Sequence, residues 1–561
     1  MKKLSLLALI LVLALCLPML TACNGDSDSD KTEKPSKNDD TTVEETVSGE
    51  ETTTEEETTT EEETTTEDYY VNEGFVFTLN GNEYSVTGYT GNTATVVIPS
   101  EYKGLPITSI GSYAFSGCTS LKSIEIPSSV TSIGERAFYN CINLMSIEIP
   151  SSVTSLDSYA FCCCTSLKSI EIPSNVTSIG DGAFSYCESL TSIEIPQSVT
   201  SIGSGAFWSC RSLESIEIPQ GVTSIGDGVF YDCRSLTSIE IPQGVMSIGE
   251  SAFSLCTNLT GIEIPQGVTS IGYSAFGGCY KLIEVINKSS LNITAGSSDN
   301  GEIALYAKEV HNGTTKIVNQ NDYLFYTYQE INYLLGYVGK DTALTLPASY
   351  NGKGYEIYWY AFSYCESLTS VEIPQGVTSI GDYAFYNCYK LVEVINKSSL
   401  DITAGSESNG EIARYAKEVH NGTTKIVNQN DYLFYTFQGT NYLLGYVGKN
   451  TVLTLPASYN GEGYEIHQFA FYYCTSLTSI EIPDSVTSIG EWVFYNCTSL
   501  TSIEIPDSVT SIGYVTFWGC TSLTTVNYTG TQEQWAAINI GSDNDPLTNA
   551  TINYNYVPDG E

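Results

Sequence analysis

The sequence LKSIEIPSSVTSIGERAFYNC, residues 121–141, decides the fold because the chain returns to it at a fixed interval. A cysteine closes each copy, and these cysteines follow one another every 23 residues, at positions 118, 141, 164, 187, 210, 233, 256 and 279. The same step separates Cys365 from Cys388, and Cys474 from Cys497 and Cys520. A short fixed period indicates one structural unit stacked on copies of itself.

The apolar positions of the unit predict how each coil is built. Leu121, Ile124 and Ile126 have the spacing of a short strand with alternate side chains turned inward, and a proline follows. Val130 then marks a return path. The sequence Ala-Phe-x-x-Cys suits a single helical or 3₁₀ turn that places a ring and a thiol in the core. We therefore expect a solenoid of short parallel strands.

The pattern L-x-x-I-x-I-P-x-x-V-x-x-I-G-x-x-A-F-x-x-C resembles the BspA-like leucine-rich repeats, a bacterial surface branch of the leucine-rich repeat superfamily. The resemblance covers roughly residues 74–556 and implies an α/β leucine-rich repeat solenoid. It departs locally at Asp157, at Met246 and at the triple Cys162, Cys163 and Cys164. It also implies a cell-surface binding protein, because several family members are adhesins for molecules of a host or partner cell.

The N-terminus predicts export and a lipid anchor. Lys2 and Lys3 precede an apolar run of secretory-signal length, which is too short to span a membrane stably. Leu-Thr-Ala-Cys at residues 20–23 resembles a bacterial lipobox, so we expect Cys23 to be acylated and to become the mature N-terminus. Buried lipid CH₂ groups would then hold the chain to the membrane. A conventional signal with a chance cysteine is the alternative.

Residues 24–68 contain repeated Thr and Glu and almost no apolar side chains. This composition predicts a disordered, extended stalk, or else a solubilising tail with no spacing role. The formal net charge of the chain is -42, which argues against a nucleic-acid partner because no basic surface is available to replace phosphate counterions.

The folded region contains a second level of repetition. Residues 280–365 match 389–474 at an offset of 109, and each block should begin with a β-hairpin like the one signalled by Asn80-Gly81. We expect three hairpin-led segments stacked as one interrupted solenoid, with three separate short solenoids as the alternative. At the C-terminus, Thr531 and Gln534 form a capping-box pair that opens a helix with Trp535 on its buried face.

These observations predict the domain organisation. The expected parts are a lipoprotein signal (1–22), an anchor and stalk (23–68), a hairpin cap with the first coil (69–118), regular repeats (119–290), a hairpin insert (291–345), repeats (346–399), a second insert (400–454), repeats (455–524) and a C-terminal cap (525–561).

Stacking turns each position of the unit into a surface row. One row is acidic, and neighbouring carboxylates about 4.8 Å apart would repel by roughly 0.9 kcal/mol in water. A cationic partner or divalent ions would relieve this repulsion, whereas a solvated row whose side chains splay apart is the alternative. The acidic row consists of Glu125, Glu148, Glu171, Glu194, Glu217, Glu240 and Glu263.

Two further rows carry polar or reactive groups. A threonine row beginning at Thr131 and broken by Met246 could bind sugars, although threonine is also a common outward strand residue. The cysteine row could form disulfides, but its core spacing favours reduced, buried thiols. Cys162 and Cys163 are expected to be exceptions, exposed or paired. No zinc-type cysteine spacing occurs.

Aromatic residues cluster in the duplicated blocks and give the preferred binding site. Alternation along a hairpin should turn some of them outward, and exposed Tyr and Trp are favoured contact residues. Packing of the hairpin onto the solenoid is the competing explanation. The candidate residues are Tyr323, Tyr326, Tyr328, Tyr333, Tyr358 and Trp359.

Catalysis finds little support in the sequence. His311 and His420 are duplicates in equivalent loops, and no nucleophile, metal-ligand or cofactor pattern accompanies them. We therefore predict no enzyme activity, no cofactor and no metal centre. The leading hypothesis is a lipid-anchored surface protein that binds an extracellular protein or glycan. The alternative is a structural spacer or coat component without a specific ligand.

Overall fold

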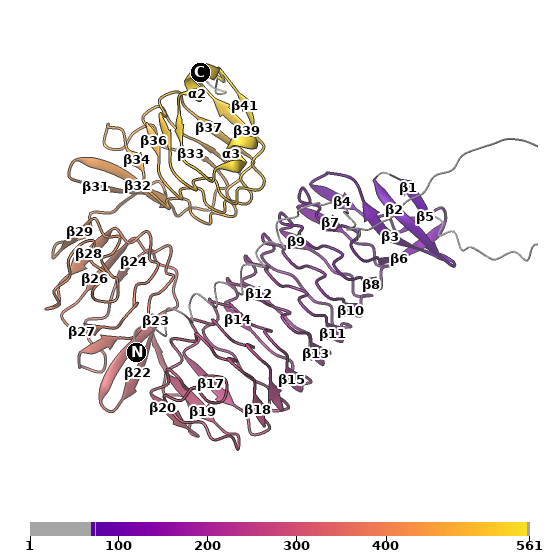
Figure 1. Cartoon of the computed structure of the whole chain (residues 1–561), viewed down its shortest axis with the longest axis horizontal. Coiled ribbons are helices and arrows are strands. Elements are labelled where there is room, and N and C mark those ends of the chain that lie inside the picture. Colours follow the sequence, from indigo (N-terminus) through magenta and orange to yellow (C-terminus); the bar gives the residue numbers. More distant parts are fainter. Residues whose placement is uncertain (1–68, 73, 558–561) are drawn as a thin grey trace, which may run out of the picture. The chain divides into compact units, whose positions relative to one another are not determined.

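The computed structural model describes residues 69–72 and 74–557. The predicted signal, the lipidation site Cys23 and the stalk lie outside these residues. Most regular coils contribute two short parallel strands, so that a segment carries two ladders running along the stack of coils (Figure 1). The register advances by one 23-residue unit per coil, as in Ser155 with Ser178 and Ser178 with Ser201. The predicted parallel solenoid is therefore confirmed.

The first segment contains the longest run of coils. Its first ladder contains β4 (Thr95–Val97), β7 (Ser123–Glu125), β9 (Ser146–Ile147), β12 (Ser192–Ile193), β14 (Ser215–Ile216), β17 (Gly261–Ile264), β19 (Glu284–Asn287) and β20 (Glu309–His311). Its second ladder contains β1 (Tyr69–Asn72), β2 (Phe75–Asn80), β3 (Glu83–Tyr89), β5 (Glu101–Tyr102), β6 (Leu105–Ile110), β8 (Ser132–Ile133), β10 (Ser155–Leu156), β11 (Ser178–Ile179), β13 (Ser201–Ile202), β15 (Ser224–Ile225), β16 (Ser247–Ile248) and β18 (Ser270–Ile271).

The second segment repeats this plan with fewer coils. One sheet contains β24 (Ala343–Thr345), β26 (Ser370–Ile373), β28 (Glu393–Asn396) and β29 (Glu418–His420). The other contains β21 (Val318–Gln320), β22 (Tyr323–Tyr328), β23 (Ile331–Tyr337), β25 (Tyr355–Ile357) and β27 (Val377–Ile380).

The third segment ends in the cap. One sheet contains β33 (Val452–Thr454), β35 (Ser479–Glu481), β37 (Ser502–Ile505), β39 (Thr525–Tyr528) and β41 (Thr551–Asn553). The other contains β30 (Val427–Gln429), β31 (Tyr432–Phe437), β32 (Thr440–Tyr446), β34 (Glu465–Ile466), β36 (Ser488–Ile489), β38 (Ser511–Ile512) and β40 (Asn539–Ile540). The helices are α2 (Gln532–Ala536) and α3 (Asp545–Asn549).

The hairpins and the C-terminal cap form as predicted. In the first hairpin, β2 pairs with β3 antiparallel, and β3 then pairs in parallel with β6 of the first coil. At the other end, the Thr531 side chain accepts from the backbone of Gln534, and the Gln534 side chain accepts in return from the backbone of Thr531. This capping box begins α2, which buries Trp535 in the third core.

The Ala-Phe-x-x-Cys part of the unit differs from its expected helical turn. It consists of successive β-turns, with hydrogen bonds such as Ala137 N–H to Gly134 O (3.2 Å) and Tyr139 N–H to Arg136 O (3.1 Å). Arg136 and Asn140 have positive φ values of 54° and 58°. These left-handed residues interrupt helical dihedrals, and they leave Phe138 N–H free to bond the Ala160 carbonyl of the next coil at 2.8 Å.

The core of each coil is filled as the apolar spacing predicts. Phenylalanines of successive coils stack from Phe115 to Phe276, with ring centroids 5.1 to 5.7 Å apart. The cysteines beside them are buried from Cys141 to Cys279. These residues bury the apolar face that one coil alone would expose to water.

The apolar residues form three main cores rather than one continuous core. The clusters extend over residues 75–307, 323–416 and 432–547. The interior is therefore interrupted at each hairpin, while smaller clusters such as Ile283 with Tyr326 and Tyr358 span the interruption. The physical reason is that each hairpin-led block begins new strands, so the inward-facing row of the previous segment ends at β20 or β29.

Candidate binding surface

The structure corrects the predicted orientation of most tyrosines in the duplicated blocks. Tyr323, Tyr326, Tyr333 and Tyr358 are buried. The Tyr323 hydroxyl donates to the Thr345 carbonyl at 3.0 Å, and the Tyr358 hydroxyl donates to the Tyr306 carbonyl at 3.0 Å. Alternation does not expose these rings because both faces of the hairpin are covered, one by the second core and the other by a small cluster with Ile283.

The other two candidate aromatic residues remain accessible. Trp359 is 48% exposed, and Tyr328 is half-buried at the end of β22. Both differ from their counterparts in the second block, where Gln468 and Phe437 occupy the equivalent positions. Only these two of the six candidate aromatic side chains are therefore accessible to a binding partner.

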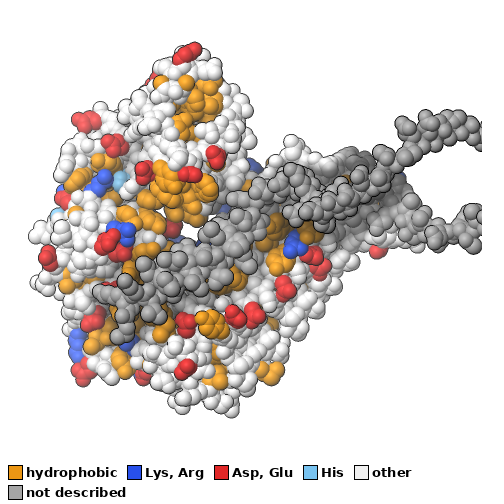
Figure 2. All heavy atoms as spheres, viewed as in Figure 1, with side chains coloured by type: hydrophobic (Ala, Val, Ile, Leu, Met, Phe, Trp, Pro, Cys, Tyr) orange, Lys and Arg blue, Asp and Glu red, His pale blue; other side chains and the backbone are white. Residues whose placement is uncertain are grey.

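The acidic row is present as a geometric row. All seven glutamates are exposed, and Glu171 forms parallel β-bridges with Glu148 and Glu194. Gln197 Nε2 donates to Glu217 Oε1 at 3.1 Å, but none of the seven carboxylates forms an ion pair with a basic side chain of residues 74–557. The row ends at Ile286, which pairs with Glu263 in the ladder. Figure 2 shows acidic side chains spread over the visible face rather than gathered in one patch.

The threonine row serves the solenoid itself. Thr131 Oγ1 donates to the Thr108 carbonyl at 3.2 Å, and Thr269 Oγ1 donates to the Met246 carbonyl at 3.1 Å. The hydroxyls that make these bonds join one coil to the preceding one. This arrangement favours the interpretation of the row as outward strand residues over that of a sugar site.

In the described part of the chain, the cysteine row consists of thiols without disulfide bonds, all buried except the half-buried Cys118, Cys365 and Cys474. Cys210 Sγ donates to the Phe184 carbonyl at 3.1 Å, and the same contact recurs along the row. Burial raises the pKa of these thiols, as in Cys187 and Cys233. Cys162 and Cys163, expected to be exposed or paired, are buried instead. Their sulfur atoms lie 3.5 Å apart, well beyond the length of a disulfide bond.

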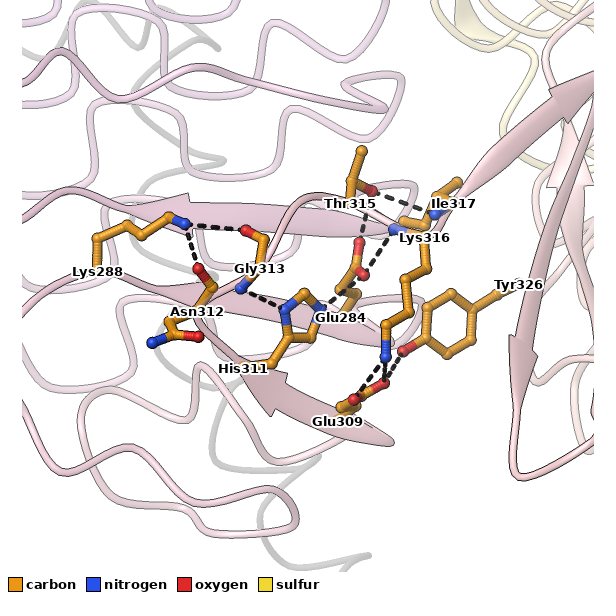
Figure 3. A network of polar contacts seen from close by, with 10 residues as sticks. All are labelled: Glu284, Lys288, Glu309, His311, Asn312, Gly313, Thr315, Lys316, Ile317 and Tyr326. Carbon is orange, nitrogen blue, oxygen red and sulfur yellow. Dashed lines mark hydrogen bonds and ion pairs between the residues drawn. The ribbon is translucent and has the colours of Figure 1, made fainter.

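The most elaborate polar arrangement centres on Glu284, which is completely buried in β19 (Figure 3). Glu284 Oε1 accepts from His311 Nε2 at 2.9 Å and from the Lys316 backbone N–H at 2.9 Å. Its Oε2 accepts from Thr315 Oγ1 at 2.5 Å. Three donors thus take the place of the water molecules that an exposed carboxylate would bind, so neither oxygen of the buried carboxylate lacks a hydrogen bond.

The contacts of His311 define its tautomer. Gly313 N–H donates to His311 Nδ1 at 3.0 Å, so Nδ1 carries the lone pair and Nε2 carries the hydrogen that Glu284 accepts. A general base needs a lone pair that can reach a substrate. Because the lone pair of His311 already accepts from Gly313, the Glu284–His311 pair acts in this conformation as a structural clasp.

A second ion pair borders the clasp. Lys316 Nζ lies 2.7 Å from both carboxylate oxygens of Glu309, and the Tyr326 hydroxyl donates to Glu309 Oε2 at 2.7 Å. The hydrogen bond from Lys316 lowers the pKa of Glu309. Burial, followed by the bond to Glu309, raises the pKa of Tyr326. This pair ties the loop after β20 to the hairpin strand β22.

The second block repeats the clasp nearly atom for atom. Glu393 is fully buried and accepts from His420 Nε2 (3.0 Å), the Lys425 backbone N–H (2.8 Å) and Thr424 Oγ1 (2.6 Å). Lys425 Nζ and the Tyr435 hydroxyl bind Glu418 as their counterparts bind Glu309. The arrangement therefore occurs twice in one chain.

The two clasps hold an exposed surface. We define the exposed strip as residues 312–322 in the first block and 421–431 in the second. Every residue of the first copy except Ile317 is exposed, and in the second copy only Ile426 and Gln429 are half-buried. The strip runs from the clasp into strand β21 or β30, so a buried glutamate fixes one end of an exposed strand.

Sequence reasoning missed the clasp and the strip, although two signals pointed to them. Glu284 and Glu393 occupy a ladder position where other coils carry small residues, as the pairing of Ser370 with Glu393 shows. The run from Tyr306 to Thr327 is also identical in both blocks. In the sequence, His311 and His420 attract attention only as candidates for catalysis.

Other site types are not found in the described residues. In residues 74–557, no group of three or more His, Cys, Asp or Glu side chains is placed to hold a metal ion. None of the helices described here is both long and apolar enough to cross a membrane.

A family comparison agrees with the coil architecture. The family model for the BspA type leucine rich repeat region matches residues 88–214, 177–300, 349–407 and 454–553, which together exceed half of the chain. No curated protein matches the chain.

Several solved structures resemble the chain. A leucine rich repeat protein of T. pallidum is 37% identical, with 34% of this chain and 90% of that chain covered and a TM-score of 0.33. A leucine rich cell surface protein of Faecalibacterium prausnitzii is 29% identical, with 84% and 97% covered and a TM-score of 0.31. A leucine-rich repeat protein of Bacteroides ovatus is 26% identical, with 86% and 99% covered and a TM-score of 0.35. On the strength of the family model, the chain belongs to the BspA-type leucine-rich repeat proteins, a family of bacterial surface proteins.

Proposed function

We propose that the chain is an exported, lipid-anchored adhesion protein that binds an extracellular protein or glycan of a host or neighbouring cell. The observation that carries this proposal is the duplicated exposed strip. In each block, hydrogen bonds to a buried glutamate hold the strip in place. The coil architecture does not require the strip, because the regular coils of the first segment lack it. A fixed exposed surface suits recognition because little ordering entropy is lost on binding.

Binding is tested with residues 24–561, the mature chain without its lipidated cysteine, on an array of glycans and extracellular-matrix proteins. We expect retention of at least one class of ligand. A variant with Lys316→Ala and Lys425→Ala changes the exposed strip in both blocks and should reduce that retention. Lys103→Ala serves as a matched control, because Lys103 is an exposed lysine outside both blocks. Absence of any ligand would support the spacer alternative.

The anchor is tested separately. The Leu-Thr-Ala-Cys sequence supports acylation at Cys23, and the Thr/Glu-rich residues 24–68 would then carry the solenoid away from the membrane. Metabolic labelling with an alkyne fatty acid should mark the wild-type chain and not the Cys23→Ser variant. Equal labelling of both chains would contradict the proposed anchor.

A further inference from the structure

The two copies of the block differ at exposed positions outside the exposed strip but not within it. Outside the strip, Lys353 is replaced by Glu462, which reverses the charge of an exposed side chain, and the exposed Trp359 is replaced by Gln468. Within the strip, all eleven residues are identical. Packing retains buried residues, but exposed residues have no such constraint. The two copies of the strip therefore present the same exposed side chains to a partner.

The clasp accounts for only part of this identity. His311, Gly313, Thr315 and the backbone of Lys316 are required by the bonds to Glu284 and to each other. The side chains of Val318 and Gln320 take no part in these bonds, yet both are exposed and both recur unchanged in the second block. These two positions alternate with Asn319 along β21, so they share one face of the strand.

Strand β21 is the edge of its sheet. In the described part of the chain, its only strand partner is β22, with Val318 opposite Phe325 and Gln320 opposite Tyr323. Strand β30 is likewise the edge of its sheet, and among the described strands it pairs only with β31. An edge strand presents backbone donors and acceptors on its open side.

Each edge strand is only three residues long, but it lacks the other features that usually block strand addition. The sequence Val-Asn-Gln contains no proline and no charged side chain, and the pairing with β22 or β31 contains no bulge at this position. The clasp also fixes the strand before a partner arrives, because Lys316 N–H and Thr315 Oγ1 are bound to a fully buried carboxylate. Such a preformed edge loses little entropy on pairing.

We infer that β21 and β30 are two equivalent docking sites, each of which binds an extended polypeptide segment of a partner protein by strand addition. This inference rests on the proposed binding function and names its partner class as protein rather than glycan. The partner backbone pairs with the open edge, while a β-branched side chain of the partner packs beside Val318 or Val427. A glycan lacks the regular array of amide donors and acceptors that this edge requires.

The experiment uses a phage-displayed library of random peptides, each about 12 residues long, selected against the mature chain; this length exceeds the five to six residues of a typical strand. We expect selected peptides with alternating β-branched and polar residues. Titration calorimetry of a selected synthetic peptide should give two peptides per chain for the wild type. It should give one for Val318→Lys or Val427→Lys alone and none for the double variant, because a charged edge residue blocks pairing.

The matched control is the double variant Val338→Lys and Val447→Lys. These valines are also duplicated and have 38% and 43% exposure, against 43% and 44% for Val318 and Val427, but they lie after β23 and β32. This control should retain two peptides per chain. Hydrogen exchange should also slow at residues 318–320 and 427–429 when the peptide is added.

Unchanged stoichiometry in the Val318→Lys, Val427→Lys variant, or a library that yields no selected peptide, would overturn strand docking. Circular dichroism of each variant checks that the coils remain folded. Failure of this inference is distinguishable from failure of the proposed function. If the array of glycans and matrix proteins retains the chain while the edge variants bind peptide as the wild type does, the binding function stands and only the docking mode falls.

Discussion

Substitution of Thr315 by valine tests whether the buried carboxylate of Glu284 holds the exposed strip in place. Valine keeps the shape of threonine but removes the hydroxyl that donates to Glu284 Oε2 at 2.5 Å and accepts from Ile317 N–H at 3.2 Å. Leaving a buried acceptor short of a donor costs about 1 to 3 kcal/mol. The local opening equilibrium should therefore become about 5- to 150-fold more favourable.

Amide hydrogen exchange measured by NMR or mass spectrometry gives this quantity directly. Lys316 N–H, which donates to Glu284 Oε1, should exchange faster by that factor, while amides of the regular coils remain unchanged. Thr424→Val makes the same change in the second block and should affect only Lys425. Thr314→Val is the matched control, because Thr314 is exposed and the donors to Glu284 are other residues. Unchanged exchange at Lys316 in the Thr315→Val variant would refute the reasoning.

Three further outcomes follow from the core. Phe207→Ala removes a ring that stacks 5.6 Å from Phe184 and should cost about 3 to 5 kcal/mol, seen as a lowered denaturation midpoint of the first segment; a midpoint within error of the wild type would contradict the stacking. Burial lowers the pKa of His467 to about 4, so the native state binds fewer protons than the unfolded state, and stability should fall by about 3 kcal/mol as pH drops from about 6.5 to about 4. The variant His467→Tyr carries the residue that the first block has at the equivalent position, Tyr358. Its stability, measured by denaturation near both ends of this pH range, should depend less on pH than that of the wild type. An unaltered pH dependence of stability would mean that other groups cause it. The native chain should react slowly with a thiol reagent at its buried cysteines, and the half-buried thiols should react first; rapid modification of the whole row before unfolding would contradict the packing. The half-buried residues are Cys118, Cys365 and Cys474.

The repeating part of the fold was accessible from the sequence because its signal is local. Phe138 and Cys141 recur at one spacing, so their shared interior follows from the period alone. The hairpins and the α2 cap were likewise predictable, since turn residues and a capping box act over a few positions.

The remaining features depend on contacts that no short motif encodes. The left-handed conformations of Arg136 and Asn140 follow from hydrogen bonds to neighbouring coils, and neither residue type requires a positive φ. The clasp joins Glu284 to residues 27 to 32 positions later. Alternation along the hairpins gives two faces and therefore predicts that some tyrosines point outward, but it does not reveal that both faces are covered.

The division of the apolar interior into three cores has a consequence for how such chains change in length. One 109-residue period, residues 317–425, contains a whole hairpin, a whole packed core and one glutamate clasp. Gain or loss of one whole block would therefore leave the neighbouring cores intact. Unequal recombination between the repeated blocks of one gene could therefore change the number of exposed edge strands, while the sequence of each coil stays the same.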